Sequence, residues 1–310
     1  MRRLLLVEKL AKDGSQALHR RSRKSATHHR LISSSSPNLV SNKNPLEENI
    51  PAPDHCDIVR GPSLLRTSVQ RPRPSLLFLP GLRSLPFWTQ YDANSQTNHV
   101  AYQDKTVSWA VEHLQANVDI IRAEYDKVAR SLKSDYQTDT EHTLHEGAWD
   151  WHSYMLKGKI QGHFCTHFPE TSDILQTLRD EGQLFEGTPF GYSFFSTLHP
   201  QSKISAHTAP MNLRVRIHLP LKVPAALSAA ASVPSRPACG IRVGTVEREW
   251  LTGQALVLDD SFEHQVWNDT DETRVLLLVD VWHPDVTFQE RKDIIQLFDH
   301  ARGQGWWSAE

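Results

Sequence analysis

The stretch "NLRVRIHLPL", residues 212–221, alternates apolar and polar side chains with a period of two. Because successive side chains of an extended strand point to opposite faces, Arg214, Arg216 and His218 should lie together on one face. The opposite face should carry the apolar residues Val215, Ile217 and Leu219. The polar stripe is either a solvated outer face or part of a site, and the surrounding sequence has to decide between these two interpretations.

Four further segments are short, rich in Val, Leu and aromatic residues, and bounded by Pro, Gly, Asn or Asp. They are YSFFSTL (192–198), CGIRVGTVEREWL (239–251), QALVLDD (254–260) and TRVLLLVDVW (273–282). Several short strands separated by turn residues are typical of an antiparallel barrel or sandwich. The interval 224–238 between two of these strands consists of small residues bracketed by prolines, which predicts a surface loop.

Two helices are predicted before the strands. From Thr106 onward, apolar residues recur every three or four positions, which is typical of one long amphipathic helix. These residues are Val107, Val111, Leu114, Val118, Ile121, Tyr125, Val128 and Leu132. A second helix is predicted in the segment 168–180, where Thr171 or Ser172 can cap the free backbone amides. We expect both helices to buttress a sheet.

Residues 1–75 combine Ser, Asn, Pro and basic residues with little apolar periodicity, so they are predicted to be a disordered tail and linker. The folded domain is then expected over residues 76–310, with the helices at its N-terminal side.

The basic, Ser-rich first forty residues are compatible with a mitochondrial transit peptide or with a plain tail. No apolar run is long enough for a transmembrane helix, and a cytoplasmic location is expected, with mitochondrial import as the alternative.

The net charge of -2 at pH 7 gives no basic surface for a nucleic acid, so a small molecule or a protein is the expected partner. The three cysteines, Cys56, Cys165 and Cys239, show neither CxxC spacing nor a disulfide framework. A reducing compartment is therefore favoured. The oligomeric state is not indicated by the sequence.

Two histidines and an arginine are spaced in a way that suggests a metal site. His207 lies between small residues in "SAHTAP", His264 follows roughly fifty residues later, and Arg274 lies ten beyond His264. This is the layout of double-stranded β-helix oxygenases, in which two imidazoles bind Fe(II) and an arginine forms a bidentate pair with a carboxylate of 2-oxoglutarate.

Longer sequence motifs make the match to this class of oxygenases more specific. "FPET" and "TLHP" are followed in order by "HTAPMNLRVRIHLPL", "CGIRVG", "DDSFEHQVWND" and "VDVWHPDVT". Together they resemble the aspartyl/asparaginyl β-hydroxylase family over roughly residues 145–290. The resemblance implies a mainly β fold with flanking helices, built on a double-stranded β-helix (jelly-roll, cupin-like) core.

The resemblance also implies the roles of single residues. The resemblance assigns the role of iron ligand to His207 and His264. The resemblance also places five residues around the co-substrate: Ser196, Arg216, His218, Arg274 and Trp151. The implied cofactors are Fe(II), 2-oxoglutarate and O₂, with ascorbate as the reductant. A planar guanidinium suits a carboxylate better than an ammonium does, so an Arg274→Lys substitution should weaken co-substrate binding.

One position departs from the family. Many related oxygenases have a third, carboxylate ligand two residues after the first histidine, whereas the family resembled here has glycine at that position and this chain has Ala209. A methyl group cannot bind iron, so water or substrate would complete the coordination, and iron should be held less tightly.

Three acids near the site are expected to have supporting roles. Asp259 and Asp260 could orient His264 or cap its turn, while Phe262 and Trp267 anchor the segment. Asp280 lies within an apolar strand and is expected to pair with an arginine or a backbone amide rather than with the metal.

The resemblance implies a dioxygenase that hydroxylates an Asp or Asn side chain of a peptide or protein and releases succinate and CO₂. A lipid or small-molecule acceptor is one alternative. Another is a catalytically inactive barrel that binds 2-oxoglutarate or a protein, an alternative that Ala209 motivates.

Overall fold

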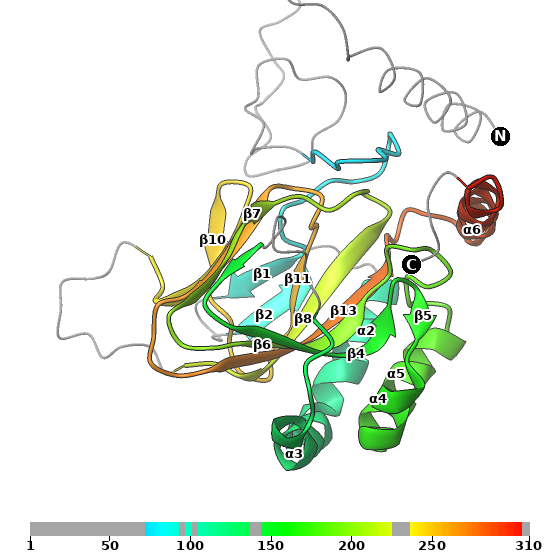
Figure 1. Ribbon diagram of the computed structural model, residues 1–310. Coiled ribbons are helices and arrows are strands. Elements are labelled where there is room, and N and C mark those ends of the chain that lie inside the picture. Colours follow the sequence, from blue (N-terminus) through cyan, green and yellow to red (C-terminus); the bar gives the residue numbers. More distant parts are fainter. Residues whose placement is uncertain (1–71, 93–96, 101–104, 137–143, 225–235, 306–310) are drawn as a thin grey trace, which may run out of the picture. The chain divides into compact units, whose positions relative to one another are not determined.

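The computed structural model describes residues 72–92, 97–100, 105–136, 144–224 and 236–305. Eight consecutive strands form two antiparallel sheets that face each other (Figure 1). They are β6 (Ser193–Leu198), β7 (Ser202–His207), β8 (Arg214–Lys222), β9 (Cys239–Val243), β10 (Val246–Arg248), β11 (Leu256–Leu258), β12 (His264–Asn268) and β13 (Arg274–Trp282).

The strand order is that of a jelly roll. One sheet has the order β11-β8-β13-β6 and the other has the order β10-β9-β12-β7, so the chain changes sheets at each connection except the β9–β10 hairpin. Strands β4 (Trp149–Leu156) and β5 (Lys159–Ile160) extend the first sheet, and β3 (His145–Glu146) extends the second. A separate hairpin pairs β1 (Thr89–Asp92) with β2 (Thr97–Val100). The predicted double-stranded β-helix is confirmed.

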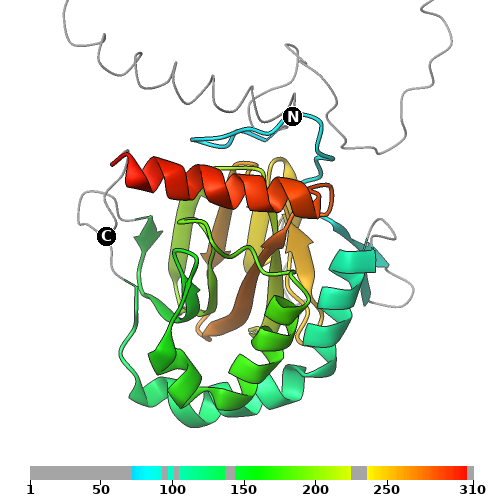
Figure 2. The ribbon, with the colours of Figure 1, turned by 90° about the vertical axis from the view of Figure 1, so that its right-hand side faces the viewer.

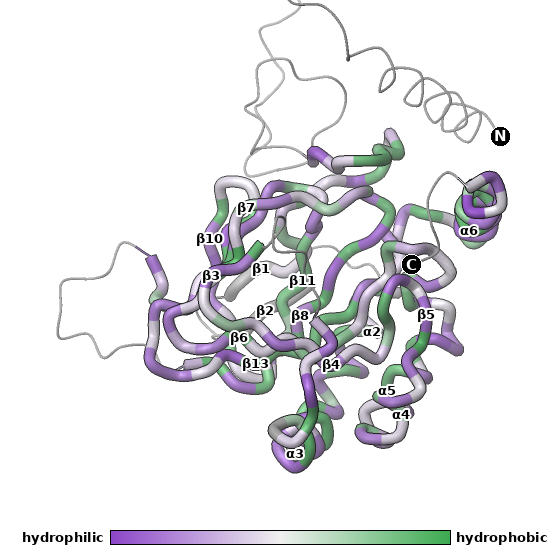
Figure 3. The backbone as a smooth tube through the Cα atoms, viewed as in Figure 1, coloured by the Kyte–Doolittle hydropathy of each residue, from purple (hydrophilic) through white to green (hydrophobic). Residues whose placement is uncertain are grey.

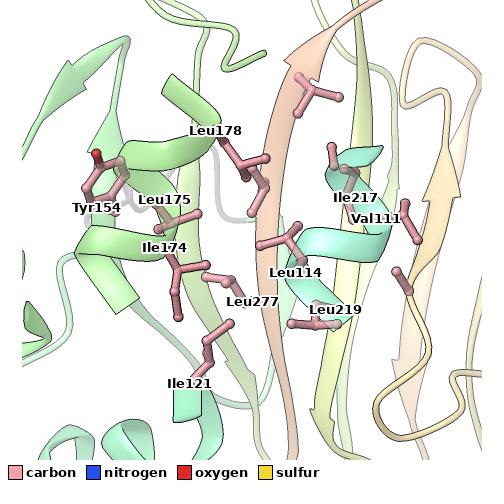
Figure 4. Close-up of a cluster of buried hydrophobic side chains, with 14 of the residues drawn as sticks. Val111, Leu114, Ile121, Tyr154, Ile174, Leu175, Leu178, Ile217, Leu219 and Leu277 are labelled. Atoms are coloured by element: carbon pink, nitrogen blue, oxygen red, sulfur yellow. The ribbon is translucent and has the colours of Figure 1, made fainter. Parts of the chain in front are cut away.

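The two faces of β8 lie in different parts of the core. Its apolar face, with Ile217 and Leu219, packs with Leu277 of β13 against helix residues such as Leu114 and Leu175 (Figure 4). Its polar face turns toward the space between the sheets, where Arg214 is 2% and His218 5% exposed. The interpretation of the polar stripe as a solvated surface is therefore wrong.

Four helices cover the outer face of the larger sheet (Figure 2). They are α2 (Lys105–Ala116), α3 (Val118–Val128), α4 (Gly162–His167) and α5 (Pro169–Asp180), with a 3-10 turn η2 (Ala129–Ser131) after α3. The prediction of one long helix from residue 106 to 132 was wrong, because the helix is interrupted at Asn117, between α2 and α3. The side-chain amide of Asn117 donates to the carbonyl of His113 over 2.8 Å, where a continuing helix would have placed a backbone amide.

The start of α5 also differs from its prediction. The helix begins at Pro169, whose missing N–H is no loss in the first turn, so Thr171 and Ser172 lie inside the helix and do not cap it. The carboxylate of Glu124, on α3, accepts instead from the backbone amides of Glu170 (2.9 Å) and Thr171 (2.8 Å). A side chain from another helix therefore supplies the cap.

The last helix, α6 (Phe288–Gly303), begins with a capping box in which Thr287 and Glu290 exchange hydrogen bonds. Hydrophobic and hydrophilic positions alternate along α6, and both kinds also occur along the strands (Figure 3). Among the helices of the described residues, none has the length and apolar character that crossing a membrane requires.

Some predictions lie outside the described residues. These are the tail up to residue 71, most of the loop 224–238, and the environment of Cys56. The boundary between tail and domain near residue 75 stays a prediction. Cys165 and Cys239 are both free thiols in the structure.

Candidate metal and co-substrate site

Two histidines from distant parts of the chain meet at the end of the smaller sheet. His207 is the last residue of β7 and His264 the first of β12, and the strand register places them directly opposite each other. Their ring centroids are 4.1 Å apart, with the ring planes inclined by 55°. The jelly-roll pairing therefore brings together the two imidazoles that the sequence analysis selected.

Each imidazole is oriented by the backbone of its own strand end. Nδ1 of His207 lies 2.7 Å from the carbonyl oxygen of Ser205, and Nδ1 of His264 lies 2.9 Å from that of Phe262. A carbonyl can only accept, so both Nδ1 atoms carry the proton and both Nε2 atoms keep a free lone pair. Within the described residues, neither Nε2 has a hydrogen-bond partner. This arrangement suits a divalent metal ion.

The electrostatics keep both rings neutral. Burial, followed by the neighbouring His207, lowers the pKa of His264 to about 3. Burial also lowers the pKa of His207 below its ordinary value. Neutral imidazole is the form that binds metal, so neither ring has to lose a proton near neutral pH to become a ligand.

Arg274 begins β13 and is 1% exposed. Its Nη2 lies 3.5 Å from the hydroxyl of Ser196, its Nε has no partner, and no carboxylate of the described residues pairs with it. Burial lowers the pKa of this guanidinium to about 10. A buried positive charge without a counter-charge is costly, and a carboxylate ligand would supply the missing partner.

His218, on β8, interacts electrostatically with both Arg274 and His264. Burial, then the charges of Arg216, Arg274 and His264, hold its pKa well below the ordinary value, so it is neutral. Its Nε2 is buried and has no partner in the structure. This atom is a second polar group that a ligand could satisfy.

Ser196 and Trp151 lie opposite each other in the pairing of β6 with β4. The hydroxyl of Ser196 accepts from the indole nitrogen of Trp149 over 2.9 Å, as well as lying near Arg274. Trp151 stacks on Phe194 with centroids 4.0 Å apart, and its own indole nitrogen is buried without a hydrogen-bond partner among the described residues. Ser196 therefore lies on β6, the strand next to Arg274, whereas Trp151 lies one strand further away, on β4.

Arg216, which the resemblance places beside the co-substrate, is paired with two carboxylates of the protein. Its guanidinium binds Asp280 (2.7 Å and 3.0 Å) and Asp260 (3.2 Å), and Arg214 contacts the same two carboxylates. Although burial opposes it, Asp260 and Asp280 raise the pKa of Arg216 above its ordinary value. The charge of Arg216 is thus neutralised by protein groups, whereas that of Arg274 is not.

Two predictions about the nearby acids can be resolved. Asp280 pairs with arginines and accepts from the backbone amide of Tyr192 over 3.1 Å, as predicted. For Asp260, orienting His264 and capping its turn were both left open, and the structure shows its side-chain oxygens paired with Arg214 and Arg216. The carboxylate of Asp259 accepts from the backbone and hydroxyl of Ser261 and so stabilises the turn.

A family model described as "Aspartyl/Asparaginyl beta-hydroxylase" matches residues 115–284, more than half of the chain. The chain belongs to the aspartyl/asparaginyl β-hydroxylase family.

Two relatives show how far the similarity extends. The mouse aspartyl/asparaginyl β-hydroxylase is 30% identical over 220 residues, which cover 71% of this chain and 26% of that protein. The mouse aspartate β-hydroxylase domain-containing protein 2 is 28% identical over 235 residues, 74% of this chain and 60% of the relative. The chain therefore spans about a quarter of the length of the first and under two thirds of the second.

A prolyl hydroxylase from Trichoplax adhaerens is a similar solved structure, with 10% identity and a TM-score of 0.37 over 61% of this chain and 92% of that one. The assignment of the fold rests on the strand order described above.

Ala209, where the sequence departs from the resembled family, lies two residues after His207 and is hydrogen-bonded to the turn before His264. Ala209 is 4% exposed, its amide donates to the carbonyl of Asp260 (2.8 Å), and its carbonyl accepts from Ser75 (3.1 Å). In the part of the chain that the structure describes, no third His, Cys, Asp or Glu completes a cluster with the two histidines. The described residues thus offer His207 and His264 as the candidate ligands of this site.

Two tryptophans at this candidate site were missed by the sequence analysis. Trp149 binds Ser196, and Trp250 contacts both His218 and Arg274. Trp149 could have been found from the alternation of β4, which places it on the same face as Trp151. Trp250 belongs to the segment 239–251 that was predicted as a strand, but the structure places it in the loop after β10, so the alternation of that segment did not indicate the direction of its side chain.

Proposed function

We propose that the chain is an Fe(II)- and 2-oxoglutarate-dependent hydroxylase. The observation that carries the proposal is the pairing of two facing, metal-ready imidazoles, His207 and His264, with a buried guanidinium, Arg274, that lacks a counter-charge. Membership of the hydroxylase family supports the same function.

The residues divide into two groups by their chemistry. His207 and His264 would hold Fe(II) through their Nε2 atoms. Arg274 would bind the distal carboxylate of 2-oxoglutarate, with Ser196 and His218 donating hydrogen bonds. When bound, iron with 2-oxoglutarate and O₂ supplies the oxidising power to turn a C–H bond into C–OH, with succinate and CO₂ as the co-products.

Around that chemistry, the chain keeps the co-substrate in a dry space. Leu198, Leu256 and Leu276 are fully buried on the inner face and exclude water beside Arg274. In such surroundings an ion pair with a ligand carboxylate is stronger than it would be in water. Arg216, with its charge already neutralised by Asp260 and Asp280, shapes this space rather than competing for the anion.

We further propose that the acceptor is an Asp or Asn side chain of a peptide or protein. The names of the two mouse relatives, aspartyl/asparaginyl β-hydroxylase and aspartate β-hydroxylase domain-containing protein 2, support Asp or Asn side chains as the acceptors. The experiment described next would also detect a lipid or small-molecule acceptor, or binding without turnover.

The test is succinate formation by the purified protein with Fe(II), ascorbate, 2-oxoglutarate and O₂, with mass spectrometry of a peptide and metabolite panel for the gain of one oxygen atom. The proposal predicts succinate and an oxidised peptide with the natural protein, and neither with His207→Ala or His264→Ala. If all three proteins gave the same background while the natural protein bound 2-oxoglutarate in a metal-dependent way, the chain would be a binding module. If a lipid or metabolite were oxidised instead of a peptide, only the proposed class of acceptor would be wrong, and the proposed hydroxylase activity would stand.

A further inference from the structure

Trp250 lies in the loop between β10 and β11, is 2% exposed, and packs in the hydrophobic cluster between the sheets. The loop is tied to β8 because the amide of Gly253 donates to the carbonyl of Pro220 over 2.8 Å. From this position, the indole contacts two of the polar groups described above. Its Nε1 lies 3.3 Å from Nδ1 of His218, and the Cζ atom of Arg274 lies 5.0 Å from its ring centroid.

The contact with His218 sets the direction of a hydrogen bond. An indole nitrogen can only donate, so Nδ1 of His218 has to be the acceptor. A neutral imidazole that accepts at Nδ1 carries its proton on Nε2, and burial keeps this ring neutral. The unpartnered Nε2 of His218 is therefore a donor, which is what a carboxylate or carbonyl oxygen of a ligand needs.

The contact between Trp250 and Arg274 holds the guanidinium in place without neutralising its charge. The ring face of an indole attracts a guanidinium through a cation–π interaction and fixes its position. A carboxylate in the same place would also hold the arginine but would satisfy it, as Asp280 does for Arg216. With Trp250 as its support, Arg274 keeps its capacity to bind an anion.

We propose that Trp250 is a positioning residue of the co-substrate pocket, which fixes the Nε2–H tautomer of His218 and the placement of the Arg274 guanidinium for one dicarboxylate ligand. The inference rests on the proposed function, since it concerns the binding of 2-oxoglutarate. Trp250 itself acts through its two neighbours.

The test measures the Kd of 2-oxoglutarate by calorimetry without O₂, with Mn(II) in place of iron, so that turnover plays no part. Trp250→Phe keeps an aromatic ring and removes only the N–H donor. We expect this variant to weaken binding by about two- to tenfold, because the lost hydrogen bond joins Trp250 to His218 and only part of the His218 rings then present an Nε2–H donor to the ligand. In a His218→Phe background the same substitution should have no further effect, because the group on which it acts is gone.

A second variant separates the ring from the N–H group. Trp250→Leu removes the ring face under Arg274 and should weaken binding further, in both the natural and the His218→Phe backgrounds. The matched control is Trp88→Phe, another buried indole with an arginine, Arg83, 5.1 Å over its ring, but in the core cluster on the helix side of the sheet. This control should leave the Kd unchanged. Circular dichroism and thermal unfolding establish that each variant is folded.

A tautomer measurement provides a readout that a purely structural role would not change. The ¹⁵N chemical shifts of the His218 ring should report a proton on Nε2 in the natural protein and a mixture of tautomers in Trp250→Phe. If Trp250→Phe bound 2-oxoglutarate as tightly as the natural protein, or lost the same factor with and without His218, the inference would be overturned while the proposed function stood. If the natural protein bound no 2-oxoglutarate with metal present, the proposed function would fail and the inference with it.

Discussion

His264 lies directly across the strand pair from His207, with their ring centroids 4.1 Å apart, although the two residues come from opposite ends of the β7–β12 segment of the chain. Each ring is fixed by the carbonyl two residues before it, at Ser205 and Phe262. Strand register and local backbone together place both Nε2 atoms without help from a side chain. The candidate metal site is thus a direct product of the jelly-roll pairing.

Loss of either imidazole should therefore weaken metal binding while leaving the barrel folded. His207→Ala and His264→Ala should each reduce the affinity for Mn(II) by about 100-fold or more, since even the loss of a group that orients a ligand typically costs 10- to 100-fold. Calorimetry measures this, with His163→Ala as the control, because that ring is exposed and pairs only with Asp135. Unchanged affinity in either site variant would exclude the assigned ligand.

The buried charges between the sheets should contribute to stability as a unit. Asp280→Ala would leave Arg214 and Arg216 sharing Asp260 alone, and removal of one partner from a buried ion pair costs about 3–5 kcal/mol. Urea denaturation of this variant should show a loss of that size. Asp299→Ala, which removes an exposed partner of Arg302, should cost less than about 1 kcal/mol. Similar losses in the two variants would contradict the account.

The cap supplied by Glu124 predicts a smaller effect. Glu124→Ala removes the acceptor for two amides at the start of α5 and should lower the free energy of unfolding by about 1–2 kcal/mol. Glu112→Ala, on the exposed side of α2, provides the control in the same denaturation experiment and should have little effect. A Glu124→Ala protein as stable as this control would show that the cap contributes nothing.

The turn before His264 should make stability depend on pH. Burial raises the pKa of Asp259 to about 7, whereas the unfolded chain releases this proton near pH ~3.9. The folded state binds the proton more strongly, so the stabilisation is fully present below pH ~4 and is lost as the pH rises through about 7. The stability of the natural protein relative to Asp259→Asn should therefore fall by up to about 1.4 kcal/mol per pH unit in this window. A relative stability that stayed constant or rose would contradict the raised pKa.

Much of the fold could be predicted from the sequence because β8 and β13 are long and strongly patterned. Strands β7 and β12, which carry both histidines, are short, and no alternation identified them in advance. Their existence follows from pairing with each other, which is a property of the folded chain.

The features that the sequence could not predict depend on contacts between distant segments. Glu124 caps a helix that starts 45 residues later at Pro169, and Asp260 turns to arginines on β8 rather than to the nearby His264. The support that Trp250 gives to Arg274 is of the same kind, since a loop brings it there. Local patterns of residues contain no information about such partners.

The most direct test of the account is the affinity of the metal-loaded protein for 2-oxoglutarate in the absence of O₂, compared between the natural protein and Arg274→Ala. Because a buried, unpaired guanidinium is assigned to the distal carboxylate, the variant should bind about 30-fold more weakly or worse, and Arg274→Lys should fall between the two. Equal affinity in the natural protein and Arg274→Ala, or no binding to the natural protein, would contradict the central claim.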